Sequence, residues 1–130
     1  MPPKVAKRRI LVIDDDKNVV DLLSSFLREG GYEVISALDP VQGFMAAQKQ
    51  LPDVVLLDVA MPAGGGLPLL KKLTASNKLR RVPVIVITAA TDPGLEPQMK
   101  DAGARAFLKK PLERETILSA VGQVLAPPAA

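Results

Sequence analysis

Three short apolar runs, largely of β-branched residues and leucine, most constrain the fold of this chain. They are Arg9–Ile13, Val54–Leu57 and Val82–Ile87, and each stops abruptly at a polar residue. A run that is apolar at consecutive positions, rather than at every second one, is typical of a strand buried on both faces of a parallel sheet. Two weaker strand patterns lie at residues 32–37 and 106–109.

Helical patterns separate these runs. The clearest has apolar residues from Val19 to Leu27 at i, i+3, i+4, i+7 and i+8, and Gly30 marks its end. A second helix is expected to begin at Asp39–Pro40, because aspartate caps helices and proline suits their first turn. Patterns at 69–73 and 117–124 predict two more helices. The alternation predicts an α/β fold, a doubly wound parallel sheet with helices on both faces.

The segment from residue 92 to 102 has the weakest helical pattern. Pro93, Gly94 and Pro97 all disfavour a helix in its first half. We therefore expect a helix that begins near Pro97, or a frayed one.

Composition excludes several function classes. The 130 residues contain no Cys and no His, which excludes disulfides, thiol chemistry, the common zinc sites and Ser-His or Cys-His catalytic pairs. The net charge of +3 comes from four cations within the first nine residues. We interpret them as part of a mobile arm rather than a nucleic-acid surface. No apolar run is long enough for a membrane span, and we expect a cytoplasmic protein.

Length and local composition suggest one folded domain. We expect a basic, flexible N-terminal arm at residues 1–8, a folded domain at 9–125 and a disordered Pro/Ala-rich tail at 126–130.

Polar residues follow the predicted strands at their carboxyl ends, where parallel α/β sheets place their functional crevice. They are Asp14–Asp16, Asp58, Thr88 and Lys109–Lys110. Several carboxylates in one crevice repel one another unless a cation lies among them, and oxygen ligands favour Mg²⁺. A hydroxyl and an ammonium group nearby suit the oxygens of a transferred phosphoryl group.

The chain resembles the receiver domain of bacterial two-component response regulators, and is similar to stand-alone chemotaxis-type members, over residues 8–125. The resemblance rests on Ile10–Asp16, Pro52–Asp58 with Met61–Pro62, Pro83–Ala89, Gly103–Ala104 and Phe107–Pro111. It implies a five-stranded flavodoxin-like sheet in the order 2-1-3-4-5.

The resemblance also implies a role for each residue of the predicted site. Asp58 would accept a phosphoryl group from a phosphohistidine. Asp15, Asp58 and the backbone carbonyl of Ala60 would bind Mg²⁺ directly, and Asp14 would hold it through water. Lys110, not Lys109, would pair with a phosphoryl oxygen.

Two further residues are implied as a switch. The hydroxyl of Thr88 would move toward the phosphoryl group, and Phe107 would then turn inward. The face formed by the fourth expected helix, within 92–102, the last strand, 106–109, and the last helix, 117–124, would carry the signal to an unknown effector protein. The partner upstream would be a sensor histidine kinase or a phosphotransfer protein. The protein would be a monomer or weak dimer without nucleic-acid binding or membrane insertion, and would catalyse only its own phosphorylation and dephosphorylation.

The sequence departs from the family at several positions. Many relatives carry an acidic residue in place of Gly65 and another in place of Pro68, so we expect the Gly64–Gly66 run to be loose. Phe107 lacks the hydroxyl of a tyrosine, so packing alone must report the switch. Small Ala60 and Ala89 beside the site suggest easy access for water or a phosphatase, and hence a short-lived phosphoryl group.

Two alternatives remain open at this point. Asp14–Asp15–Asp16 resembles the Asp-x-Asp motif of haloacid-dehalogenase-like phosphatases, with Asp14 as nucleophile and Asp16 as acid and base. Alternatively, the chain is a docking module that keeps the receiver fold but does not use phosphorylation. The acid-free cationic stretch from Lys71 to Arg81 is a solvated face or a docking edge.

Overall fold

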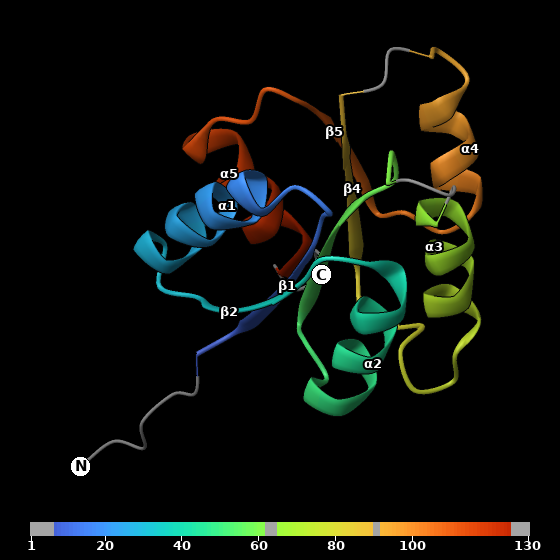
Figure 1. Ribbon diagram of the computed structural model, residues 1–130, viewed down its shortest axis with the longest axis horizontal. Helices are drawn as coiled ribbons and strands as arrows, with labels where there is room; N and C mark the ends of the chain where they lie inside the picture. The colour runs from blue at the N-terminus through green and yellow to red at the C-terminus, as the bar shows by residue number, and fades with distance from the viewer. Residues whose placement is uncertain (1–6, 62–64, 90–91, 126–130) are drawn as a thin grey trace, which may run out of the picture.

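The computed structural model describes residues 7–61, 65–89 and 92–125, where strands and helices alternate (Figure 1). Most of the predicted arm and the whole predicted tail lie outside these residues. The elements in chain order are β1 (Arg9–Ile13), α1 (Lys17–Glu29), β2 (Glu33–Ala37), α2 (Pro40–Gln50), β3 (Val54–Asp58), α3 (Gly66–Ala75), β4 (Val84–Thr88), α4 (Leu95–Asp101), β5 (Ala106–Lys109) and α5 (Arg114–Leu125).

The five described strands form one parallel sheet in the order β2-β1-β3-β4-β5. This confirms the predicted doubly wound fold and the order implied by the resemblance. The central strands β1, β3 and β4 are buried along almost their whole length, as their continuous apolar runs predict.

Helices cover both faces of the sheet and enclose two apolar cores. In Figure 1, α1 and α5 lie together on one face, and α2, α3 and α4 lie on the other. Neighbouring residues of one strand serve opposite cores, because successive side chains point to opposite faces. Leu56 of β3 belongs to the α1/α5 core, and Leu57 belongs to the other.

Capping residues set several helix ends. Asp16 caps α1 by accepting a hydrogen bond from the Asn18 amide at 2.9 Å, and Asp39 caps α2 through the Gln42 amide at 2.8 Å. Gly30 is the C-cap of α1, as predicted. The predicted start of α4 near Pro97 was two residues late. The helix begins at Leu95, so Pro97 lies in its first turn. Proline is tolerated there, because the amide hydrogen that it lacks would have no partner within the helix.

The prediction of a loose glycine run was wrong for the two of its glycines that are described. Gly65 is the N-cap of α3, and Gly66 is the buried first residue of that helix. A Cβ on Gly66 would lie 2.2 Å from the Cα of Val59, so only glycine allows this approach of backbone to backbone. Gly64 lies outside the described residues.

No helix in the described ranges is long and apolar enough to cross a membrane.

Candidate functional site

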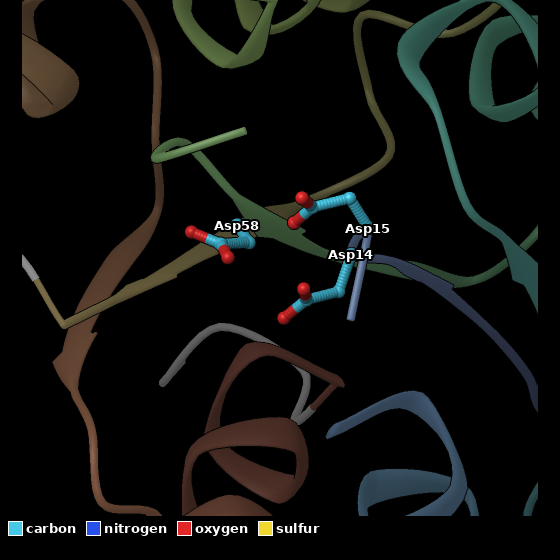
Figure 2. A group of neighbouring side chains, drawn as sticks. All are labelled: Asp14, Asp15 and Asp58. Atoms are coloured by element: carbon cyan, nitrogen blue, oxygen red, sulfur yellow. The ribbon is translucent and has the colours of Figure 1, made fainter. Parts of the chain in front are cut away.

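Three carboxyl groups meet at the carboxyl ends of β1 and β3, which are neighbours in the sheet. Asp14 and Asp15 directly follow β1, and Asp58 is the last residue of β3. Figure 2 shows their side chains close together, and one carboxylate oxygen from each lies within 4.8 Å of the others. Asp14 and Asp58 are buried, whereas Asp15 is exposed. The three aspartates are therefore close enough to share one cation.

Backbone amides fix one oxygen of each buried carboxyl group. The amide of Asp16 donates to Oδ1 of Asp14 at 2.9 Å, and the amide of Ala60 donates to Oδ1 of Asp58 at 2.9 Å. Both are bonds from residue i+2, the turn that aspartate readily forms with its own backbone. These turns hold Oδ2 of Asp14 and Oδ2 of Asp58 toward the same neighbour.

That neighbour is Lys110, whose Nζ donates to Oδ2 of Asp14 at 3.0 Å and to Oδ2 of Asp58 at 3.1 Å. The Lys110 amide also donates to the carbonyl of Thr88 at 2.9 Å, which ties the end of β5 to the end of β4. The adjacent Lys109 is exposed. Of the two predicted lysines, the structure therefore brings Lys110 into the cluster and leaves Lys109 outside it.

Burial and charge act together on the site. Burial raises the pKa of Asp14, and its hydrogen bonds with the Asp16 amide and Lys110 offset only part of that rise. Burial on its own lowers the pKa of Lys110, but its hydrogen bonds with Asp14 and Asp58 and their charges outweigh that effect, so its pKa is raised. Lys110 therefore stays an ammonium group, and it faces more carboxyl groups than it can neutralise.

The two predicted switch residues lie in β4 and β5, and Thr88 is the one in contact with the cluster, through the Lys110 amide. Thr88 is the last residue of β4 and is fully buried, and its strand lies between β3 and β5. Phe107 of β5 pairs with Val86 of β4 and is half-buried against the α2/α3/α4 core. Thr88 therefore lies in the strand next to that of Asp58, and Phe107 lies three residues before Lys110.

The donor set fits a magnesium ion. The three aspartates provide only oxygen atoms, and Mg²⁺ prefers one or two protein carboxylates together with water. The exposure of Asp15 leaves one side of the cluster open to such waters.

Two contacts of the site were not predicted from the sequence. The first is the Ala60 amide, since only its carbonyl was expected to matter. The sequence signal for that hydrogen bond is an aspartate at the end of a strand, directly before a turn. The second is the pairing of Lys110 with both Asp14 and Asp58, since Lys110 was expected to pair with a phosphoryl oxygen. Asp16, the acid–base residue of the phosphatase alternative, is used as the cap of α1.

Comparisons with known proteins agree with this geometry. A family model described as the response regulator receiver domain matches residues 10–122. Protein PilH of Pseudomonas aeruginosa is 34% identical over 118 residues, which cover 91% of this chain and 98% of PilH. Response regulator PleD of Caulobacter vibrioides is 40% identical over 105 residues, which cover 81% of this chain but 23% of PleD.

Solved structures are similar in fold. Chemotaxis protein CheY4 of Vibrio cholerae superimposes with a TM-score of 0.87 at 32% identity, over 92% of this chain and 100% of CheY4. A response regulator from Chloroflexus aurantiacus gives a TM-score of 0.88 at 30% identity, over 94% of this chain and 100% of that one. Given the family match over residues 10–122, this chain belongs to the response regulator receiver domains, which are switch proteins of two-component signalling.

Proposed function

We propose that this protein is a phosphorylation-dependent switch in which Asp58 accepts a phosphoryl group from a histidine kinase or a phosphotransfer protein. The observation that carries the proposal is the setting of the Asp58 carboxyl group. One oxygen is held by the Ala60 amide, and the other is held by the ammonium group of Lys110. A carboxylate fixed in this way is oriented for attack.

The transfer needs no general base. An oxygen of the Asp58 carboxylate attacks the phosphorus of a phosphohistidine, the new O–P bond forms, and the P–N bond breaks. The imidazole of the donor leaves with the electron pair of that bond and takes a proton from solvent. Because an ionised carboxylate has no proton to lose before it attacks, a chain without histidine can carry out this step.

The acidic cluster would hold Mg²⁺ through Asp15, Asp58 and the backbone carbonyl of Ala60, with Asp14 acting through water. When bound, Mg²⁺ would offset the negative charge of the phosphoryl oxygens and of the carboxylates around them. Receiver domains bind Mg²⁺ at an acidic pocket of this kind, and the three converging aspartates support the same assignment here.

Phosphorylation would change the partners of Lys110 and Thr88. A phosphoryl group adds about −1.5 to −2 charges and strong acceptor oxygens. Lys110 would exchange a carboxylate oxygen for a phosphoryl oxygen, and the Thr88 hydroxyl would donate to another. Because the Lys110 amide is bonded to the Thr88 carbonyl, movements of these two loops would be coupled. Phe107 would turn inward and alter the α4-β5-α5 face, which would bind an effector protein.

The remaining assignments stay predictions. They are the arm at residues 1–8 and the tail at 126–130, a cytoplasmic location, and a monomer or weak dimer. A short-lived phosphoryl group is also still predicted, and the exposure of Ala60 and Ala89 supports it. An acyl phosphate with a half-life of many hours would contradict that last prediction.

The test is phosphorylation by a small donor. The wild-type protein is treated with acetyl phosphate and Mg²⁺, and its intact mass is measured. We expect the addition of one phosphoryl group, and no addition in EDTA or in Asp58→Asn. If the wild type gains nothing under conditions in which another receiver domain is phosphorylated, the proposed switch is contradicted and the docking-module alternative is favoured.

A further inference from the structure

An apolar groove of about 250 Å³ lies between α2 and α3. It is separate from the aspartate cluster, and it is on the opposite face of the sheet from α1 and α5. Two of its apolar residues, Val41 and Met45, are 70% and 50% exposed. Its lining residues are Pro40, Val41, Phe44, Met45, Gly65, Pro68, Leu69 and Lys72. Packing within the domain therefore leaves an uncovered apolar surface here.

Close packing of the two helices fixes one end of the groove. A Cβ on Gly65 would lie 2.3 Å from Cγ of Pro40, so the N-terminal ends of α3 and α2 are in direct contact. Gly66 packs in the same way against the backbone of Val59. The groove is thus formed by two helices that are held in place, and a ligand would not have to order its walls.

The rim of the groove is basic. Nζ of Lys72 lies 5.5 Å from the centroid of the Phe44 ring, at the groove itself. Lys49 lies one helical turn beyond Met45 on the same side of α2. Neither α2 nor α3 contains Asp or Glu. Among the described residues no carboxylate forms an ion pair with Lys72 or Lys49. The groove therefore complements an apolar ligand that also carries negative charge.

Occupants from this chain itself fit poorly. The segment 1–8 carries three cationic side chains and no acidic one, so the basic rim repels it. The segment 126–130 follows α5, which is on the other face of the sheet. A symmetric contact with a second copy would bring two basic rims together. A groove smaller than the roughly 300–1,000 Å³ of small-molecule pockets also suits side chains of a peptide better than a cofactor.

We propose that the α2–α3 groove docks an acidic amphipathic helix of a partner protein. Apolar side chains one turn apart on that helix enter the groove between Val41 and Leu69, and a glutamate or aspartate pairs with Lys72. This is recognition of a helix by a hydrophobic groove, with the charge of the rim selecting an acidic partner. The surface is distinct from the α4-β5-α5 face and does not require phosphorylation of Asp58.

The test uses a synthetic amphipathic helix of leucines and glutamates, and the same peptide with lysines in place of the glutamates. Each is titrated into the ¹⁵N-labelled full chain, and amide shifts are followed by NMR. We expect the glutamate peptide to shift amides of α2 and α3, and the lysine peptide to bind more weakly. Lys72→Glu should weaken the glutamate peptide about three- to tenfold, because a favourable charge pair becomes a repulsive one.

Matched variants keep the test specific. Lys71→Glu reverses the charge of the exposed neighbour outside the groove, and it should weaken the glutamate peptide less than Lys72→Glu does. Val41→Asp should also weaken that peptide, and Leu22→Asp, on α1, should not. The proposal is overturned if both peptides bind equally, if the shifts fall on α1 and α5, or if the two lysine variants behave alike. Self-association through α2 and α3 at higher protein concentration would also overturn it.

Discussion

Ion pairs lie at both ends of the parallel sheet, and they differ in burial. At the amino end, Nε of Arg9 lies 3.2 Å from Oε2 of Glu33, and its amide donates to Asp53 at 2.7 Å. The side chains of Arg9 and Glu33 are 48% and 52% exposed. At the carboxyl end, Lys110 holds Asp14 and Asp58 at similar distances, but the side chain of Asp14 is 0% exposed and that of Lys110 is 19% exposed.

This difference in burial distinguishes the exposed ion pair at the amino end from the buried carboxyl cluster at the carboxyl end. In water, the pair at the amino end gains little, because solvent screens both charges. At the carboxyl end the charges are partly desolvated, so an imbalance is costly. Two carboxyl groups pair with one ammonium group there, and a third lies beside those two. The imbalance favours binding of a cation, and it allows a new negative group to redistribute the contacts of Lys110.

The largest effect on stability is expected from Lys110→Ala. The substitution leaves Asp14 and Asp58 without their cation, and it should lower the free energy of unfolding by about 3 kcal/mol in EDTA at neutral pH. Urea denaturation followed by circular dichroism measures this loss. The matched control is Lys109→Ala, at the exposed neighbour, which should change stability by less than about 0.5 kcal/mol. Equal losses in the two variants would contradict the comparison.

A gain in stability is expected from Asp14→Asn. The substitution removes one buried carboxylate and leaves Lys110 paired with Asp58, so the free energy of unfolding in EDTA should rise by about 1–2 kcal/mol. Mg²⁺ affinity should fall at the same time. Asp15→Asn is the control, since that side chain is exposed and its replacement should stabilise the protein less. A loss of stability in Asp14→Asn would show that Lys110 needs both carboxylates.

The gain in stability from Asp14→Asn should depend on pH. Because burial raises the pKa of Asp14, the folded protein binds its proton more tightly than the unfolded chain does. Stability from this group is present at low pH and is lost as the pH rises from the unfolded value of 3.8 through the raised folded pKa. The advantage of Asp14→Asn over the wild type should therefore grow across that window and then level off. Denaturation midpoints measured in steps of pH would detect this, and a constant advantage would contradict it.

The smallest effect is expected from Glu33→Gln at the amino end. It removes the exposed partner of Arg9 and should lower the free energy of unfolding by less than about 1 kcal/mol, with the loss shrinking in high salt. Denaturation at low and high ionic strength measures both. A loss as large as that of Lys110→Ala would mean that burial does not distinguish the two ends.

Much of the fold could be predicted because local patterns and tertiary structure agree. The apolar run before Asp58 became a buried strand, and Asp39–Pro40 began a helix. The start of α4 was predicted too late because Pro97 lies in the first turn, where the helix does not use the amide hydrogen that proline lacks. Gly66 was misjudged because its role depends on the Val59 backbone, which no local pattern reports.

The candidate site could be predicted as a set of residues but not as a set of contacts. Parallel strands bring their carboxyl ends together, so the order of Asp14, Asp58 and Lys110 along the chain was informative. The equal sharing of Lys110 between the two aspartates depends on side-chain distances of 3.0 and 3.1 Å, which the sequence does not contain. The same is true of the α2–α3 groove, which arises from the packing of two helices.

The central claim is that Asp58 is the residue phosphorylated. The most direct test is to phosphorylate the protein with acetyl phosphate and Mg²⁺, reduce the acyl phosphate with borohydride to homoserine, and locate the converted residue by peptide mass spectrometry. We expect homoserine at position 58 and none at positions 14 or 15. Homoserine at position 14 would support a phosphatase-like nucleophile, and its absence at all three positions in a protein that binds Mg²⁺ would contradict the proposed switch.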